Sequence, residues 1–157
     1  IYQCDWSSDV CSSDLWSDPK KIAQWLSPTG TEMEYLKADI RAGGTSSYKM
    51  GNDQFTMYGR ADYIKVEAPH CLIYTQQFTD KDGNVSRHPF APVWPETMLT
   101  HVDFTALDDH TTLVSVTWEA TGNDTPEELE FFVNARAGMT MGWTGSFDKF
   151  DAFLLQK

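Results

Sequence analysis

Two pairs of polar side chains have the types and the spacing to do chemistry. His101 and Asp103 are two residues apart in a stretch that alternates polar and apolar residues, so a strand would place both on one face. A histidine beside a carboxylate can transfer protons near neutral pH. The other face of this strand would carry the apolar set, Met98, Thr100, Val102 and Phe104. Because that set must face the core, we expect His101 and Asp103 to face water.

Asp39 and Arg41 form the second pair, also two residues apart in an alternating stretch. On an inward face, Arg41 would be available to bind a carboxylate of a ligand, and we retain it as a ligand-binding candidate. The alternative is a structural ion pair that fixes the strand next to Gly43 and Gly44. We favour the structural pair.

Other reactive residue types occur without the arrangement of a known reactive centre. His88 lies in a loop with three prolines that we place near the mouth of a cavity, whereas His70 and His110 flank turns and are expected in solvent. The sequence contains no GxSxG elbow and no HExxH motif, and Ser146 has no evident base. A hydrolase with a nucleophile is therefore not supported.

Acidic and sulfur-containing residues give no indication of a metal or a cofactor. Four acids gather at the start of a predicted helix, where capping and the helix dipole explain them better than a metal does: Asp124, Glu127, Glu128 and Glu130. The three cysteines, Cys4, Cys11 and Cys71, lack both zinc spacing and an even count. We expect no metal, no cofactor, a strand position for Cys71 and a cytoplasmic location.

Length and charge exclude several classes of protein. The chain has 157 residues, enough for one domain. Its 12 basic and 23 acidic residues give a net charge of −11, which disfavours nucleic acids and anionic membrane surfaces. No run of 18 apolar residues occurs, so we expect no membrane-spanning helix.

The elements that must position these residues are one sheet and one long helix. A short helix is predicted over 20–26 after an Asp18-Pro19 start. Alternation and turn residues then predict six antiparallel strands, over 33–42, 45–50, 55–66, 71–78, 97–107 and 111–121. A capping box at Thr125 starts a predicted helix of about eight turns that runs to Lys157. Only this helix can cover a face of the sheet, so the fold class is α+β.

Aromatic residues are abundant, with 9 Phe, 6 Trp and 6 Tyr, and they predict either a cavity or a bulky core. We expect the helix to line a cavity with Met139, Trp143, Phe147 and Phe150. Opposite them we place Tyr63, Tyr74, Trp94, Met98, Thr100 and Trp118. The alternative is that the same side chains fill the core and leave no usable space. Gly138 and Gly142 would either let the helix approach the sheet or leave room for a ligand.

Residues 1–15 differ in character from the rest. They contain a stuttered repeat, Ser7-Ser8-Asp9-Val10 and Ser12-Ser13-Asp14-Leu15, and carry no basic residue. The segment resembles translated adapter sequence, and we treat it as a scar or a disordered tail. The domain is then expected to span 16–157.

Several short motifs occur together in a recognisable order. They are Trp16-Ser17-Asp18-Pro19, Gln24-Trp25-Leu26, Asp39-Ile40-Arg41-Ala42-Gly43-Gly44, Gly59 with Tyr63, Trp94-Pro95, Gly138-Met139, Gly142-Trp143 and Ser146-Phe147-Asp148. With them the chain resembles the START-like SRPBCC superfamily, and more closely the family named after the activator of the heat-shock-protein-90 ATPase. The resemblance implies a helix-grip fold, in which a curved antiparallel sheet wraps a long C-terminal helix with a cavity between them.

The resemblance also implies an additional first strand beside the last one. In this chain the segment 1–15 occupies that place, and its first six residues make a poor strand. We therefore expect an open edge near 111–121, a tendency to pair as a homodimer, and lower stability than a version with a proper first strand.

Three functions follow as expectations. The first is binding of a small hydrophobic or amphipathic molecule in the cavity, without catalysis. The second, implied by the superfamily, is a polyketide-cyclase-like enzyme that would use Asp39, Arg41, His88 or His101 as its acid or base. The third is a co-chaperone that stimulates a chaperone ATPase, which rests on family analogy alone.

Overall fold

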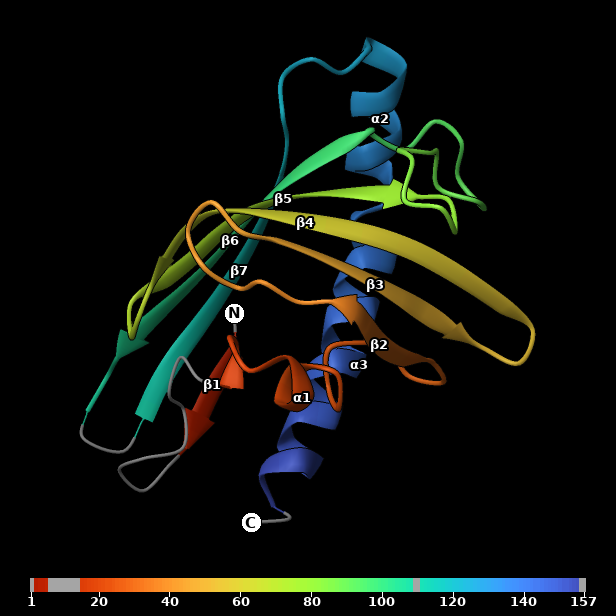
Figure 1. Ribbon diagram of the computed structural model, residues 1–157. Coiled ribbons are helices and arrows are strands. Elements are labelled where there is room, and N and C mark those ends of the chain that lie inside the picture. Colours follow the sequence, from red (N-terminus) through yellow and green to blue (C-terminus); the bar gives the residue numbers. More distant parts are fainter. Residues whose placement is uncertain (1, 6–14, 109–110, 156–157) are drawn as a thin grey trace.

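The computed structural model describes residues 2–5, 15–108 and 111–155 (Figure 1). Its elements are β1 (Tyr2–Asp5), α1 (Pro19–Ile22), β2 (Glu32–Lys37), β3 (Thr45–Asn52), β4 (Phe55–Glu67), β5 (Cys71–Thr79), β6 (Thr97–Ala106), β7 (Thr111–Ala120), α2 (Pro126–Asn134) and α3 (Arg136–Leu154). The six predicted strands are all present. The first helix is shorter than the predicted 20–26.

The strands form one antiparallel sheet in the order β1-β7-β6-β5-β4-β3-β2. Consecutive strands from β2 to β7 are neighbours, as is usual for strands that follow one another in the chain. Figure 1 shows the sheet curving past α3, which runs along one side of it. The predicted α+β fold, a curved antiparallel sheet around a C-terminal helix, is confirmed.

The alternating pattern of β6 reports which face of the sheet is buried. Met98, Thr100 and Val102 are at most 2% exposed. His101 is only partly buried and Asp103 is exposed. The predicted inward set therefore packs towards the helix, and the His101–Asp103 pair lies on the outer face.

Aromatic side chains from both ends of the chain form the core. The rings of Trp16 and Trp25 lie 4.5 Å apart, as do those of Trp25 and Phe150. Leu15 is fully buried in the same cluster. Leu15 therefore packs with the core of the domain, and the boundary between residues 15 and 16 stays a prediction.

β1 pairs with the first part of β7, over residues 111–114. Tyr2 pairs with Val114 and Asp5 with Thr111, in antiparallel register. The resemblance placed a first strand in this position correctly. The expectation that the first residues make a poor strand is wrong for Tyr2–Asp5, and the expectation of an open edge is wrong over residues 111–114 of β7. The origin of segment 1–15 stays a prediction, and residues 6–14 lie outside the described chain.

The predicted eight-turn helix is divided into α2 and α3. Ala135 separates them, with φ −79° and ψ −2°. The predicted capping box is present, because the Thr125 hydroxyl accepts from the Glu128 backbone N–H at 3.3 Å and the Glu128 carboxylate accepts from the Thr125 N–H at 2.8 Å. A single interrupting residue leaves the apolar periodicity intact, so the pattern could not reveal the division.

Candidate functional site

A cavity of about 480 Å³, partly open to solvent, lies between the sheet and the helices. Its volume falls within the range of roughly 300–1,000 Å³ that is typical of small-molecule sites. Its walls come from β2 to β5, from β7, α2 and α3, and from the proline-rich loop between β5 and β6.

Glycines on α3 keep the helix wall open. A Cβ built on Gly138 would meet no atom within 4 Å, and one on Gly142 would only reach Pro28 Cγ at 4.0 Å. Both glycines line the cavity. Gly145 differs, because a Cβ there would lie 2.6 Å from the Thr29 hydroxyl. The first two glycines leave space, and the third permits close approach of the helix to a loop.

Lys149 on α3 holds that loop in place. Its ammonium donates to the backbone carbonyls of Ser27 and Thr31, at 3.2 and 3.0 Å, and to the Ser27 hydroxyl. Burial lowers the pKa of Lys149. The contact fixes Ser27 and Pro28, which line the cavity beside α3.

Four tyrosines from consecutive strands form the sheet wall. Tyr35 on β2 pairs directly with Tyr48 on β3, and Tyr63 on β4 pairs with Tyr74 on β5. The ring centroids are 6.3 and 5.6 Å apart within the two pairs. Gly59 lies opposite Tyr48 in the register, and a Cβ there would lie 2.4 Å from the Tyr48 ring. The glycine therefore makes room for Tyr48.

These four residues, Tyr35, Tyr48, Tyr63 and Tyr74, are called the tyrosine row below. Burial, with a contribution from Tyr63, raises the pKa of Tyr48 to about 12. Burial also raises the pKa values of the other three phenols. All four hydroxyls are therefore protonated and uncharged at neutral pH.

Three indole rings and a phenyl ring gather at another part of the wall. Trp118 lies between Trp94 and Trp143, with centroids 6.5 and 5.9 Å away and near-perpendicular ring planes. Phe131 of α2 packs against Trp94 at 6.3 Å. Such edge-to-face packing gives a rigid apolar surface.

The proline-rich loop is tied to α2 by one arginine. Arg87 donates to the Trp94 carbonyl at 3.1 Å and forms an ion pair with the Glu128 carboxylate. Hydrogen bonds from the Thr125 backbone and from Arg87 lower the pKa of Glu128. The tether holds His88 and Trp94 of this loop at the cavity.

His88 is the single histidine among the described residues that line the cavity. Its Nδ1 accepts a hydrogen bond from the Phe90 N–H at 3.0 Å, so the neutral ring carries its proton on Nε2. Burial lowers the pKa of His88, which favours this neutral form. The ring is therefore a hydrogen-bond donor at Nε2.

Charged side chains are absent from the cavity wall, as far as the described residues reach. None of the residues that line it is Asp, Glu, Lys or Arg. Lys49 follows Tyr48 on β3, so it points to the opposite face, where it pairs with Glu34 at 2.8 Å. In the part of the chain with described coordinates, no cluster of three or more His, Cys, Asp or Glu side chains is suited to a metal.

Six of the predicted site residues line the cavity: Tyr63, Tyr74, Trp94, Trp118, Met139 and Trp143. Met98 and Thr100 are buried in the sheet beneath it, and the Thr100 hydroxyl donates to Gln76 at 3.3 Å. Phe147 and Phe150 pack into the core cluster instead. His70 is exposed, and His110 lies outside the described residues.

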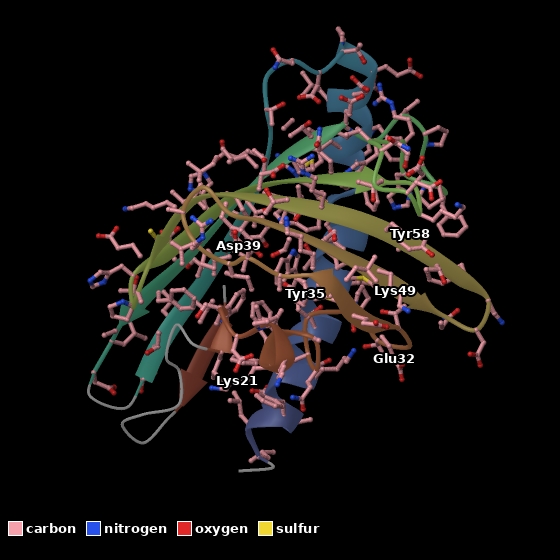
Figure 2. The ribbon with its side chains drawn as sticks, viewed as in Figure 1. Lys21, Glu32, Tyr35, Asp39, Lys49 and Tyr58 are labelled. Atoms are coloured by element: carbon pink, nitrogen blue, oxygen red, sulfur yellow. The ribbon has the colours of Figure 1, made fainter. Side chains whose placement is uncertain are left out.

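Arg41 lies outside the cavity. The strand predicted over 33–42 ends at Lys37, so Asp39 and Arg41 occupy the following turn. Their ion pair forms at 2.8 Å, and the Arg41 side chain is 70% exposed. Figure 2 shows Asp39 far from Tyr58, which lines the cavity. The two side chains therefore form a partly exposed ion pair outside the cavity, and a structural role for it stays a prediction.

Several lining residues were not among the predicted site residues. They include Met33, Tyr35, Tyr48, Met50, Met57, Gln76 and Phe131. Most of them lie on β2 and β3, whose pairing register the sequence pattern does not specify. The opposition of Tyr48 and Gly59 is the signal that would have identified this wall, because an aromatic ring often packs over a glycine on the next strand.

Comparisons with known proteins agree with this fold. The family model for activator of Hsp90 ATPase homolog 1-like protein matches residues 14–154. A solution structure of a protein from Arthrobacter aurescens superposes with a TM-score of 0.76 at 21% identity, covering 99% of this chain and 84% of that one. A crystal structure of a Mycobacterium smegmatis protein superposes with a TM-score of 0.73 at 21% identity, covering 97% of this chain and 87% of that one. A solution structure of a Staphylococcus epidermidis protein superposes with a TM-score of 0.70 at 19% identity, covering 99% of this chain and 88% of that one.

At these low identities, the superpositions show a shared fold. The search of curated proteins finds no match. Among the described helices, none is both long enough and apolar enough to cross a bilayer.

Proposed function

The chain belongs to the activator of Hsp90 ATPase homolog 1-like family, and we propose that it binds a small hydrophobic or amphipathic molecule in the cavity between the sheet and α3. The observation that carries this proposal is the uncharged, aromatic wall around about 480 Å³ of space. Two glycines on α3 leave that space unfilled, although alanine would be the better helix former at both positions.

A neutral fluorescent probe tests the proposal without knowledge of the natural ligand. N-phenyl-1-naphthylamine is apolar and brightens when it leaves water. Titration into the protein should give a saturable increase in emission. Six tryptophans occur in the chain, and four of them line the cavity, so energy transfer from tryptophan to the probe should rise in parallel.

Variants of α3 then locate the probe. Gly138→Leu should weaken binding by roughly tenfold or more, because the displaced contacts correspond to one or two buried methylenes. Ala137→Leu is the matched control, since Ala137 is exposed on the same helix and is not among the lining residues. Equal affinity in both variants would contradict the proposal, and so would a wild-type protein that does not bind the probe.

One observation supports a polyketide-cyclase-like enzyme as a second candidate. Of the four acid–base residues considered, His88 lines the cavity, whereas Asp39, Arg41 and His101 are not among the lining residues. As a donor at Nε2, His88 would polarise a carbonyl rather than remove a proton. Under this hypothesis His88→Phe would abolish turnover of a bound substrate while leaving its affinity largely intact.

The co-chaperone role rests on the family name. A pull-down with the chaperone that retained none of this chain would remove that hypothesis.

A further inference from the structure

The polar groups of the cavity are concentrated on its sheet wall. The helix wall presents Met139, Trp143, two glycines and Ser146, whose hydroxyl donates to the Gly142 carbonyl of the same helix at 3.2 Å. The sheet wall presents the tyrosine row and Gln76. A molecule bound between the two walls therefore meets most of the hydrogen-bonding groups on the sheet side and a mainly apolar surface on the helix side.

Two of these polar groups retain hydrogen-bonding capacity. The Tyr48 phenol lines the cavity, whereas the Tyr63 phenol interacts with Ser46 and Tyr35. The Gln76 carbonyl accepts from Thr100, which leaves its amide N–H groups without a described partner.

Tyr48 and Gln76 are also close together. Both line the main cavity, and both line a second void of about 10 Å³ beside it. A ligand oxygen placed between them would accept from both groups, and a ligand hydroxyl would also be able to donate to the phenol oxygen.

The electrostatic surroundings disfavour an anion at this place. The phenols stay protonated, and no cationic side chain lines the cavity among the described residues. The protein as a whole carries a net charge of −11. A carboxylate or phosphate would lose its hydration without gaining a counter-charge.

From this arrangement we infer that the cavity selects uncharged molecules that carry a hydroxyl or carbonyl oxygen on an apolar ring, and that Tyr48 and Gln76 bind that oxygen. The inference rests on the proposed function, since it specifies the ligand of the same cavity. This selection would favour such molecules over fatty acids and other carboxylates. An apolar cavity without these two hydrogen-bonding groups would offer no hydrogen bond by which to prefer them.

Three naphthalenes of one skeleton test the selection. Naphthalene, 2-naphthol and 2-naphthoate are allowed to displace N-phenyl-1-naphthylamine at pH 7, where the naphthol is uncharged. We expect 2-naphthol to bind roughly three- to tenfold more tightly than naphthalene, the effect of one neutral hydrogen bond. We expect 2-naphthoate to bind at least about tenfold more weakly than 2-naphthol.

Variants assign the hydrogen bonds. Tyr48→Phe should lower the affinity for 2-naphthol towards that for naphthalene, and Tyr48→Phe with Gln76→Met should remove the difference completely. The affinity for naphthalene should stay within about twofold in both variants, which also shows that the cavity is intact. His88→Phe is the control for a donor that the proline-rich loop contributes to the wall.

The outcomes separate this inference from the proposed function. If the fluorescent probe does not bind at all, the proposed function fails. If the probe binds but 2-naphthoate competes as well as 2-naphthol, the selection is refuted. If the preference survives in the double variant, or disappears in His88→Phe alone, Tyr48 and Gln76 are not the recognising groups.

Discussion

Three glycines on one helix should respond differently to the same substitution. Alanine at Gly138 or Gly142 would place its methyl group in open space, because the nearest atom is at least 4.0 Å away. Each change should therefore stabilise the protein by the helix-propensity difference of about 0.5–1 kcal/mol. For a domain of this size, that corresponds to a rise in Tm of about 1–4 °C.

Alanine at Gly145 gains the same helix propensity, but its methyl group would clash with Thr29. The new methyl group would lie 2.6 Å from the hydroxyl oxygen and 3.1 Å from the backbone nitrogen of Thr29. Moving that loop would also disturb the contacts that Lys149 makes with it. Overpacking of this kind typically costs about 1–3 kcal/mol, so Gly145→Ala should destabilise the protein on balance.

Thermal and urea unfolding, followed by circular dichroism, measure all three variants. The reasoning predicts two stabilised proteins and one destabilised protein. If Gly145→Ala is as stable as Gly142→Ala, the close approach of α3 to the loop is refuted. If Gly138→Ala and Gly142→Ala are both destabilised, the space beside them is refuted.

Three further predictions concern the loop and the tyrosine row. Burial lowers the pKa of His88, so as the pH falls below about 6.5 the unfolded chain binds the proton before the folded protein does, and the folded protein loses stability. The Tm of the wild type should therefore fall further than the Tm of His88→Gln between pH 7.5 and 5.5. Equal decreases in Tm would contradict this reasoning. Arg87→Ala should lower Tm by releasing the loop from Glu128, and the deficit should shrink in 1 M NaCl; a salt-independent deficit would argue against the ion pair. Gly59→Ala should force Tyr48 into the cavity and weaken binding of N-phenyl-1-naphthylamine, whereas unchanged affinity would show that the ring has another position.

The strands and their inward faces were predictable because both signals are local. Alternation sets the face, and residues such as Gly51 and Gly83 mark the turns. The end of β2 was predicted less well. Its alternation continues beyond Lys37, but the chain turns there, with Gly43 at φ +76° and the backbone of Gly44 tight against Asp39. Arg41 was therefore predicted to lie in a strand, whereas it lies in the turn that follows β2.

The cavity itself depends on information that a pattern does not carry. Met139 and Trp143, which were expected on one face of the helix, both line the cavity, and a helical face can be predicted because it is periodic. Whether Gly138 and Gly142 leave space or allow contact depends on the path of α3 relative to the sheet, which tertiary packing decides. Tyr35 and Tyr48 were missed because their pairing follows from the register of β2 and β3.

Methionine methyl groups offer the most direct test of where a ligand binds. Four of the six methionines line the cavity, namely Met33, Met50, Met57 and Met139, whereas Met141 on the same helix is 73% exposed. With ¹³C-methyl methionine and N-phenyl-1-naphthylamine, the account predicts shift changes and contacts to the probe at the four lining methyl groups and none at Met141. Changes confined to Met141, or no changes at saturating probe, would contradict the central claim that this cavity is the binding site.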